Sequence, residues 1–390
     1  MSTKKIVSLL LIFAVVLLPY GFSGISFGTL LIAIILIVIF SSGRINSFHF
    51  GNRYLPYFLY ALIIPTLCVM VRYGINSFSI IDTMCLLSIA YIQYNYDEKV
   101  FLKFYRYLVF TCVIVYCCQE ILYLAAGYRF SGLIPSLPLI YEGTVDVSMA
   151  DFRLAQQESE RASSIFLEAA QFAQVLLPFL CIELFSKEKI SRTAIVLTVI
   201  LLLLRSGNGL LLMSMIWLIR LLVYNPSKKK YFSLLLILPL ITIAVKYYIS
   251  MESSEILVER FNGIKNNIDN ASHSGFIRIF RGYYLFDALP LFDKFFGLNS
   301  GSVLSAEVTK YPIYWLFQND LYLNSFQSNL VYTGIIGTVL YYSWLLSYLK
   351  KVTICGKVII MSFIFLNFIA SLSFPMFLLY FISAITFKKQ

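Results

Sequence analysis

The sequence predicts an all-α polytopic membrane protein. Of its 390 residues, 59% are hydrophobic and 13% are charged, whereas a soluble domain carries about 25% charged residues. The mean hydropathy of +0.79 is that of a chain whose surroundings are largely lipid, where helices satisfy every backbone polar group internally. No stretch of the sequence reads as a separate soluble unit, so we treat residues 1–390 as one integral membrane domain.

Apolar runs of membrane length define the expected helices. The first run follows Lys4 and Lys5 and is predicted to be an uncleaved helix, because no small-residue cleavage pattern follows it. Several runs are shorter than the roughly 20 residues that cross a 30 Å core, so we expect about twelve spans, with about ten as the lower limit. In chain order the runs are 6–20, 24–41, 54–71, 78–94, 107–126, 164–185, 193–204, 209–224, 231–247, 326–348, 357–370 and 374–387.

The positions of lysine and arginine predict the orientation, because short cytoplasmic connections are rich in these residues. The stretch 225–230, Asn-Pro-Ser-Lys-Lys-Lys, indicates one inner turn. With both termini cytoplasmic, the short outer connections hold only Arg72, Arg205 and the border residue Lys246. The cations assigned to the inner side are Lys4, Lys5, Arg44, Arg53, Lys99, Lys103, Arg106, Lys187, Lys189, Arg192, Arg220, Lys228, Lys229, Lys230, Lys350, Lys351, Lys357, Lys388 and Lys389.

Two long loops, about 127–163 and 248–325, then face outward and carry the remaining cations. The positive-inside rule does not govern long loops. A transporter has short loops and places its polar residues within the helix bundle, whereas here the polar residues collect on one face. The sequence therefore predicts an anion-handling site at the outer membrane–water interface.

The first candidate segment, Arg161–Glu168, lies where the first long loop enters an apolar run. Seven positions separate its two ends, close to two helical turns, so we expect both side chains on one face of a helix. Glu168 would then lie one turn inside the apolar region, where an ionised carboxylate costs about 2.5–3.5 kcal/mol. Such a group indicates catalysis or pairing, and the alternative is polar contact between helices, shared with Gln171.

The second candidate is Leu204–Gly209, where Arg205 interrupts two apolar runs. Ser206, Gly207 and Asn208 predict a broken helix or a tight outer turn with free backbone N–H groups. A helix start beside a guanidinium favours phosphate binding. The alternative is that the arginine only extends toward outer headgroups.

The third candidate begins at Ser274–Gly282 and continues through an aromatic run to Phe296. Arg278 and Arg281 are three positions apart, so on a helix they can hold one anion together. The apolar residues around them predict an amphipathic helix in the outer interface. Ordinary headgroup anchoring is the alternative.

A fourth segment, Phe296–Gly301, has glycines that permit a turn close to a ligand, and a surface turn is its alternative. Nearby groups that could act as a base, or only solvate the loop, are Asp287, Asp293, Glu307 and Asp320, together with His273.

No Walker A glycine loop, metal-ligand pattern or nucleophile elbow occurs in the sequence. We therefore expect neither a cofactor nor a metal. We expect no nucleic-acid partner either, because the chain has no basic soluble module.

Taken together, these segments resemble the bacterial O-antigen polymerase (Wzy) family and, more distantly, the O-antigen ligases. Ala169 stands where family members often have proline, and Gln327 and Asn329 stand where they often have His-Asn. The residues that carry the resemblance are Arg161–Glu168, Arg205-Ser206-Gly207, Ser274-Gly275 with Arg278 and Gly297, and Ser325–Leu330 leading into Tyr332–Gly337.

The resemblance implies glycosyl transfer on the outer face of the bacterial inner membrane. A growing glycan would leave undecaprenyl pyrophosphate and join a new lipid-linked repeat unit, producing O-antigen, capsule or exopolysaccharide. The implied partners are the lipid-linked oligosaccharide, membrane lipids, a chain-length regulator and a flippase.

On this reading the arginines stabilise the pyrophosphate charge that develops in the transition state. Arg205, Arg278 and Arg281 would take that role, and Arg161 would pair with Glu168 or contact phosphate. Glu168, or a loop aspartate, would be the base that activates the acceptor hydroxyl. The loop aromatics expected to stack on sugar rings are Tyr283, Tyr284, Tyr314 and Trp315.

Three other classes remain as alternatives. An O-antigen ligase shares the layout but relies on a loop histidine, for which only His273 is available in this region. A lipid-linked glycan flippase would have short loops and buried charges along a central path. A scaffolding membrane protein would not account for the arginine placement.

Overall fold

The computed structural model describes residues 2–22, 24–43, 53–74, 78–140, 161–186, 188–224, 282–299 and 323–389. It is mostly helical. The helices in these ranges are α1 (Thr3–Val16), α2 (Phe27–Ser41), α3 (Tyr54–Tyr73), α4 (Ile80–Ile92), α5 (Glu98–Ala126), α7 (Ala169–Phe185), α8 (Arg192–Leu203), α9 (Gly207–Tyr224), α13 (Gly282–Ala288), α14 (Leu291–Phe296), α16 (Ser325–Ser347), α17 (Ile354–Asn367) and α18 (Phe374–Ile385), with the 3₁₀ turn η5 (Tyr348–Lys350). A two-stranded antiparallel hairpin, β1 (Gly21–Phe22) and β2 (Ile25–Ser26), joins α1 to α2.

The predicted apolar runs correspond to helices throughout the described residues. Every run overlaps one helix, except 231–247, which lies outside the described ranges. Within the described ranges, four helices are long and apolar enough to cross a membrane, namely Tyr54–Tyr73, Glu98–Ala126, Gly207–Tyr224 and Ser325–Lys350, and several shorter helices are also apolar. The all-α membrane character of the chain is therefore supported, while the number of spans and the side of each end remain predictions.

Polar side chains at the helix starts determine several boundaries. Asp97 accepts a hydrogen bond from the Val100 amide at 3.1 Å, so α5 begins at Glu98 and is longer than the predicted run 107–126. Asn324 and Gln327 form a reciprocal capping box at the start of α16. Such bonds satisfy N–H groups that the first turn of a helix leaves without an intrahelical acceptor.

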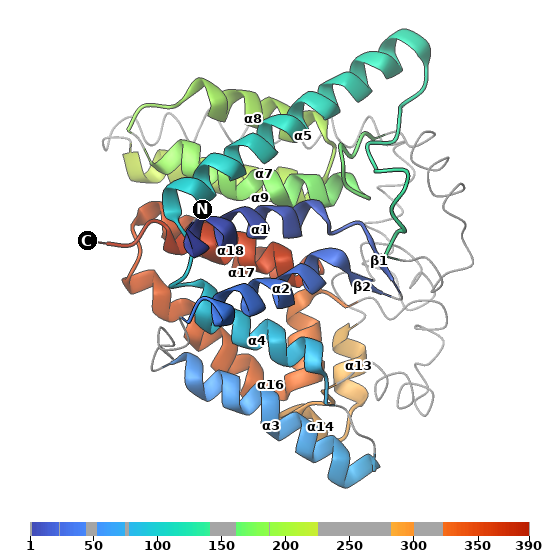
Figure 1. Ribbon diagram of the computed structural model, residues 1–390, viewed down its shortest axis with the longest axis vertical. Coiled ribbons are helices and arrows are strands. Elements are labelled where there is room, and N and C mark those ends of the chain that lie inside the picture. The colour runs from blue at the N-terminus through green and yellow to red at the C-terminus, as the bar shows by residue number, and fades with distance from the viewer. Residues whose placement is uncertain are drawn as a thin grey trace.

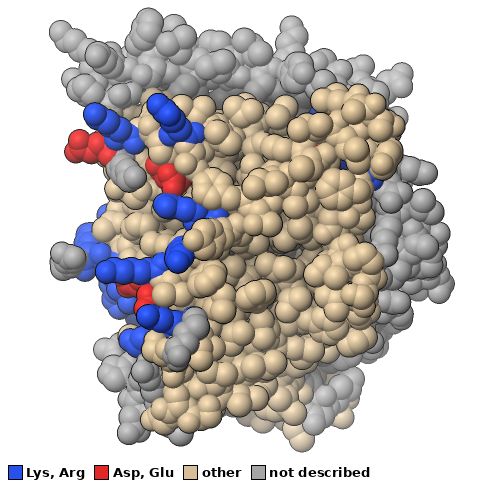
Figure 2. Space-filling model, turned by 45° about the horizontal axis from the view of Figure 1, so that its top comes forward, with Lys and Arg blue, Asp and Glu red and all other residues tan. Residues whose placement is uncertain are grey.

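The helices run between two ends of the bundle (Figure 1). Both chain termini lie at one end, which we call the terminal end, and the β1–β2 hairpin lies at the other, the hairpin end. At the terminal end, Lys388 is close enough to Glu98, Lys351 and Lys4 to interact with them electrostatically. Most charged side chains on the face in Figure 2 gather along this same end, and the rest of that face is largely uncharged. This is the charge distribution expected of a membrane-embedded bundle.

The described part of the first long loop packs against the hairpin. Tyr20 forms an isolated β-bridge with Leu139. Its hydroxyl accepts a hydrogen bond from the Ile134 amide at 2.6 Å, and the Gly21 amide donates to the Pro138 carbonyl at 3.1 Å. The loop is thereby attached to the hairpin end.

Helix α7 lies at the centre of the bundle and packs against α5, α8, α9, α17 and α18. Every residue from Phe172 to Phe185 is buried. Because α7 is held on all sides, the residues that precede it are anchored to a rigid element at the hairpin end.

Candidate anion-binding site

The turn between α8 and α9 has the broken-helix form predicted around Arg205. Helix α8 ends at Leu203, α9 begins at Gly207, and Arg205 between them has a φ of +50°. An L-residue seldom adopts this left-handed conformation, which costs about 1–3 kcal/mol and occurs often at functional sites. Ser206 follows with its side chain accepting a bond from the Gly209 amide at 3.4 Å. The half-buried Arg205 side chain therefore lies at the start of an 18-residue helix.

The segment 161–168 is not helical, and the prediction of a continuous helix face through it is wrong. Helix α7 begins only at Ala169, and Ser164 has a φ of +57°. The hydroxyl of Ser164 donates to the Cys112 carbonyl at 2.7 Å, and its amide donates to the Gln119 side chain at 2.9 Å. Hydrogen bonds to α5 therefore replace the helical ones in this segment.

Glu168 is placed differently from the prediction for the same reason. It is the N-cap residue of α7, with an extended backbone and no side-chain cap bond, and it is exposed. The expected position one turn inside an apolar helix is therefore wrong. Its carboxylate is at the helix start, where a negative charge interacts favourably with the helix dipole.

Arg161 and Arg205 meet although 44 positions separate them. The Nη1 atom of Arg161 donates a hydrogen bond to the backbone carbonyl oxygen of Arg205 at 3.2 Å. Both side chains are half-buried, so neither is fully surrounded by water. The Arg161 guanidinium thus reaches the backbone of the turn that carries Arg205, and we call these two residues and their surroundings the arginine cluster. A helix start with arginines beside it suits an anion.

A third arginine, Arg129, was not singled out from the sequence. Its guanidinium forms a bidentate pair with Glu120, with both N–O distances 3.2 Å, and lies 3.6 Å from the ring centroid of Tyr123. Arg129, Glu120 and Arg205 are all within electrostatic range of Tyr116. The only sequence signal for this pair was an arginine just beyond the helix-ending Gly127.

The predicted pair Arg278 and Arg281 lies outside the described residues, as do His273, Glu307, Asp320, Tyr314 and Trp315. The structure does describe the aromatic residues that follow. Tyr283 and Tyr284 on α13 are 37% and 41% exposed, and the Tyr283 ring centroid lies 6.2 Å from that of Phe326. Their faces are therefore partly accessible, as a sugar-stacking role requires.

The segment Leu291–Asn299 has a structural role, because it packs against α3 and α16. Buried Asp293 pairs with Arg72 and accepts a hydrogen bond from the Tyr73 hydroxyl at 2.7 Å, which ties α14 to α3. Helix α16 kinks at Gly334 (φ +67°), and its free Val331 and Tyr332 carbonyls accept bonds from the Leu298 and Asn299 amides at 2.9 Å.

Gly297, in the fourth candidate segment, has a φ of +84°, and a Cβ there would overlap the Tyr332 carbonyl. The atoms nearest to Gly297 belong to helix α16. Protein therefore already fills the space beside this turn, where a ligand was expected. Asp287 on α13 differs from Asp293 because its side chain is 93% exposed, 3.6 Å from the Lys294 ammonium.

Within the described ranges, no group of three or more His, Cys, Asp or Glu side chains could hold a metal ion. Comparison with known proteins adds no relative: no family model, no curated protein and no solved structure matches the chain. The function proposed below is therefore inferred from the residues themselves.

Proposed function

We propose that the protein is a polymerase of lipid-linked oligosaccharide repeat units, acting at the outer face of the bacterial cytoplasmic membrane. In this reaction the glycan on one polyprenyl pyrophosphate is transferred to the non-reducing-end hydroxyl of a second lipid-linked unit. The bond between the anomeric carbon and the pyrophosphate oxygen breaks, a glycosidic bond forms, and polyprenyl pyrophosphate leaves.

The observation that carries the proposal is the contact between Arg161 and Arg205 at the start of α9. A pyrophosphate leaving group gains negative charge as its bond to the sugar breaks. Fixed guanidinium groups and helix N–H groups stabilise such charge where it develops. The strained backbone of Arg205 is consistent with a conformation kept for this purpose.

Glu168 remains the proposed base. Its exposed carboxylate is at the same end of α7 as Arg161 and has no side-chain cap bond, so it is available to a sugar hydroxyl. Buried Asp293 does not suit this role, because its two oxygens bind Arg72 and Tyr73. Arg278 and Arg281 would add charge to the leaving-group side, and Tyr283 and Tyr284 would contact the glycan.

Deletion of the gene and analysis of glycan length test the proposal. A polymerase mutant should transfer single repeat units to the final acceptor. Loss of a ligase would instead leave long chains on the lipid carrier, and loss of a flippase would leave no repeat units outside. Full-length surface polymer in a mutant without a redundant enzyme would contradict the proposal.

A further inference from the structure

Gln119 is a buried amide that bonds to two separate loop segments at the hairpin end. It lies on α5 with 3% of its surface exposed. Its Nε2 atom donates to the Phe130 carbonyl at 3.0 Å and to the Ser164 carbonyl at 3.2 Å. Its Oε1 atom accepts from the Ser164 amide at 2.9 Å. The side chain thus uses both its donor and its acceptor groups on backbone atoms.

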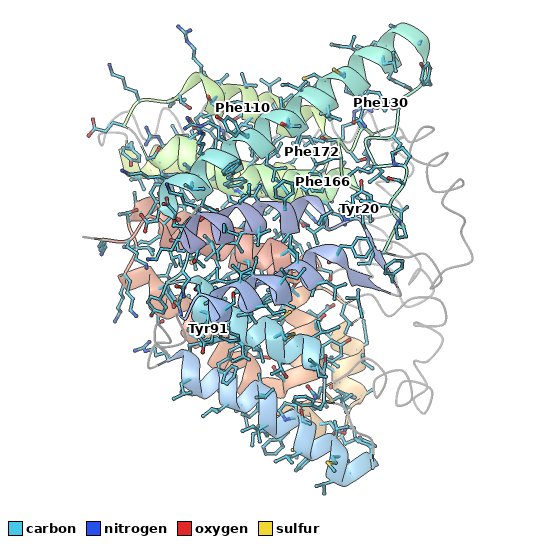
Figure 3. The ribbon with its side chains drawn as sticks, viewed as in Figure 1. Tyr20, Tyr91, Phe110, Phe130, Phe166 and Phe172 are labelled. Atoms are coloured by element: carbon cyan, nitrogen blue, oxygen red, sulfur yellow. The ribbon has the colours of Figure 1, made fainter. Side chains whose placement is uncertain are left out.

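The two segments bonded by Gln119 each carry an arginine of the cluster. Arg129 immediately precedes Phe130, and Arg161 is three positions before Ser164. Gly132 lies directly against the Ser164 carbonyl, where a Cβ would overlap it, so the two segments are also in contact with each other. Figure 3 shows Phe130, which is bonded by Gln119, and Phe166, two positions after Ser164, toward the hairpin end of the bundle.

We call Gln119 and its bonds to the two segments the clamp. The arginines near the clamp differ in how their charge is compensated. Arg129 is compensated by Glu120 through the bidentate pair, whereas Arg205 forms no ion pair with the described residues. Arg161 belongs to the segment that Gln119 holds, and its guanidinium bonds to the Arg205 backbone. The position of the Arg161 guanidinium therefore depends on Gln119. A neutral amide is suited to this place, because a carboxylate there would add a negative charge beside the anion.

We propose that Gln119 is the positioning residue of the Arg161–Arg205 site, fixing segment 161–168 so that the two guanidiniums can hold a phosphate or pyrophosphate group. The inference rests on the proposed function only for the identity of the anion. The buried amide acts through Arg161 and does not touch the ligand. A displacement of about 1 Å in such a group can lower a rate by about 100-fold.

The test compares Gln119→Leu with Gln93→Leu in the full-length purified protein. Gln93 is a matched control, since it is also buried and accepts a hydrogen bond from the Tyr348 hydroxyl at 2.9 Å, near the 3₁₀ turn η5. The probes are farnesyl pyrophosphate, inorganic pyrophosphate and anionic phospholipid vesicles, which separate a polyprenyl ligand, a free anion and a membrane headgroup. Thermal unfolding reports the general loss of stability in each variant.

We expect Gln119→Leu to weaken farnesyl pyrophosphate binding by about tenfold or more, about 1.4 kcal/mol, and to speed amide hydrogen exchange in 161–168. Gln93→Leu should do neither, although both variants lose stability. Unchanged affinity in Gln119→Leu, or equal exchange in 161–168 for both variants, would overturn the inference.

A double variant separates positioning from a direct role. If Gln119 acts through Arg161, then Gln119→Leu combined with Arg161→Ala should bind no more weakly than Arg161→Ala alone. Additive losses would overturn the inference. If the proposed anion site is wrong, Arg161→Ala and Arg205→Ala, in which Gln119 is intact, should bind with wild-type affinity. The hydrogen-exchange measurement would still test whether Gln119 holds segment 161–168.

Discussion

At the scale of single residues, side chains of the same charge lie in different surroundings. Asp293 is buried and paired with Arg72, so it holds α14 on α3. Glu168 is exposed at the start of α7, where it can meet a substrate. Arg129 is compensated by Glu120, while Arg161 and Arg205 meet through a backbone bond. The surroundings of each charged side chain, and not its residue type, are therefore the basis on which we propose a structural or a functional role.

Arg161→Ala and Arg205→Ala should each reduce polymer formation by about 100-fold or more, the usual effect of removing one group that stabilises transition-state charge. Glycan length in a complemented deletion strain is the measurement, with protein level determined in parallel. Arg106→Ala is the control, because its side chain is 58% exposed and pairs with Glu183 near the opposite end of α7. Normal chain lengths in both site variants would refute their role.

Asp293→Asn should lower the free energy of unfolding by about 2 kcal/mol, because the buried side chain loses its charge and its bonds to the partly exposed Arg72 and to Tyr73 become weaker. Thermal unfolding in detergent measures the effect. Asp287→Asn, at a side chain that is 93% exposed, should leave stability unchanged. Full stability with lost activity in Asp293→Asn would instead identify Asp293 as a catalytic residue.

At the scale of elements, close backbone contacts determine where helices break. Gly334 interrupts α16, and the carbonyls freed there accept bonds from the 298–299 segment. Arg205 separates α8 from α9 in the same bundle. Each break places non-helical backbone against protein, which is where such backbone is tolerated at membrane depth.

Gly334→Ala should destabilise the protein more than Gly74→Ala. Both glycines have a φ of +67°, but a Cβ at Gly334 would overlap the Phe295 carbonyl, whereas nothing lies within 4 Å at Gly74. We expect a cost of about 1 kcal/mol at Gly74 from the backbone conformation alone. The cost at Gly334 should be larger by about 1–3 kcal/mol because of overpacking. Equal shifts in unfolding temperature would show that α14 does not dock at the kink.

Apolar runs of sufficient length predicted the positions of most described helices and the interruption at Arg205, but not where α5 and α7 begin or that α13 and α14 are separate short helices. The start of α7 was not predictable in this way, because Ser164 forms its hydrogen bonds with Cys112 and Gln119, far away in the sequence. The role of Gln119 was not predictable for the same reason, because its bonding partners lie in distant segments. The contact of Arg161 with Arg205 also depends on tertiary packing, although both residues were identified individually.

At the scale of the whole molecule, charge and connectivity divide the bundle into two ends. Both termini lie at one end, and the hairpin, the described part of the first long loop and the start of α7 lie toward the other (Figure 1). Between the ends, the face in Figure 2 is largely uncharged. If the terminal end is cytoplasmic, as we propose from the sequence, the arginine cluster lies on the outer side of the membrane.

Cysteine labelling tests that orientation. In a chain whose seven native cysteines are replaced, a membrane-impermeant maleimide should label Glu168→Cys on intact cells. Lys389→Cys, at the terminal end, should react only after the membrane is permeabilised. The opposite pattern would place the arginine cluster in the cytoplasm and contradict an outward-facing site.

The most direct test of the central claim is the length distribution of glycan formed by the purified protein in liposomes. Polyprenyl-pyrophosphate-linked repeat units would be the only substrate. We expect a ladder of lipid-linked oligomers, one molecule of polyprenyl pyrophosphate released for each bond formed, and no ladder with Arg161→Ala or Arg205→Ala. Unchanged single repeat units with the folded wild-type protein, or an equal ladder with both variants, would contradict it.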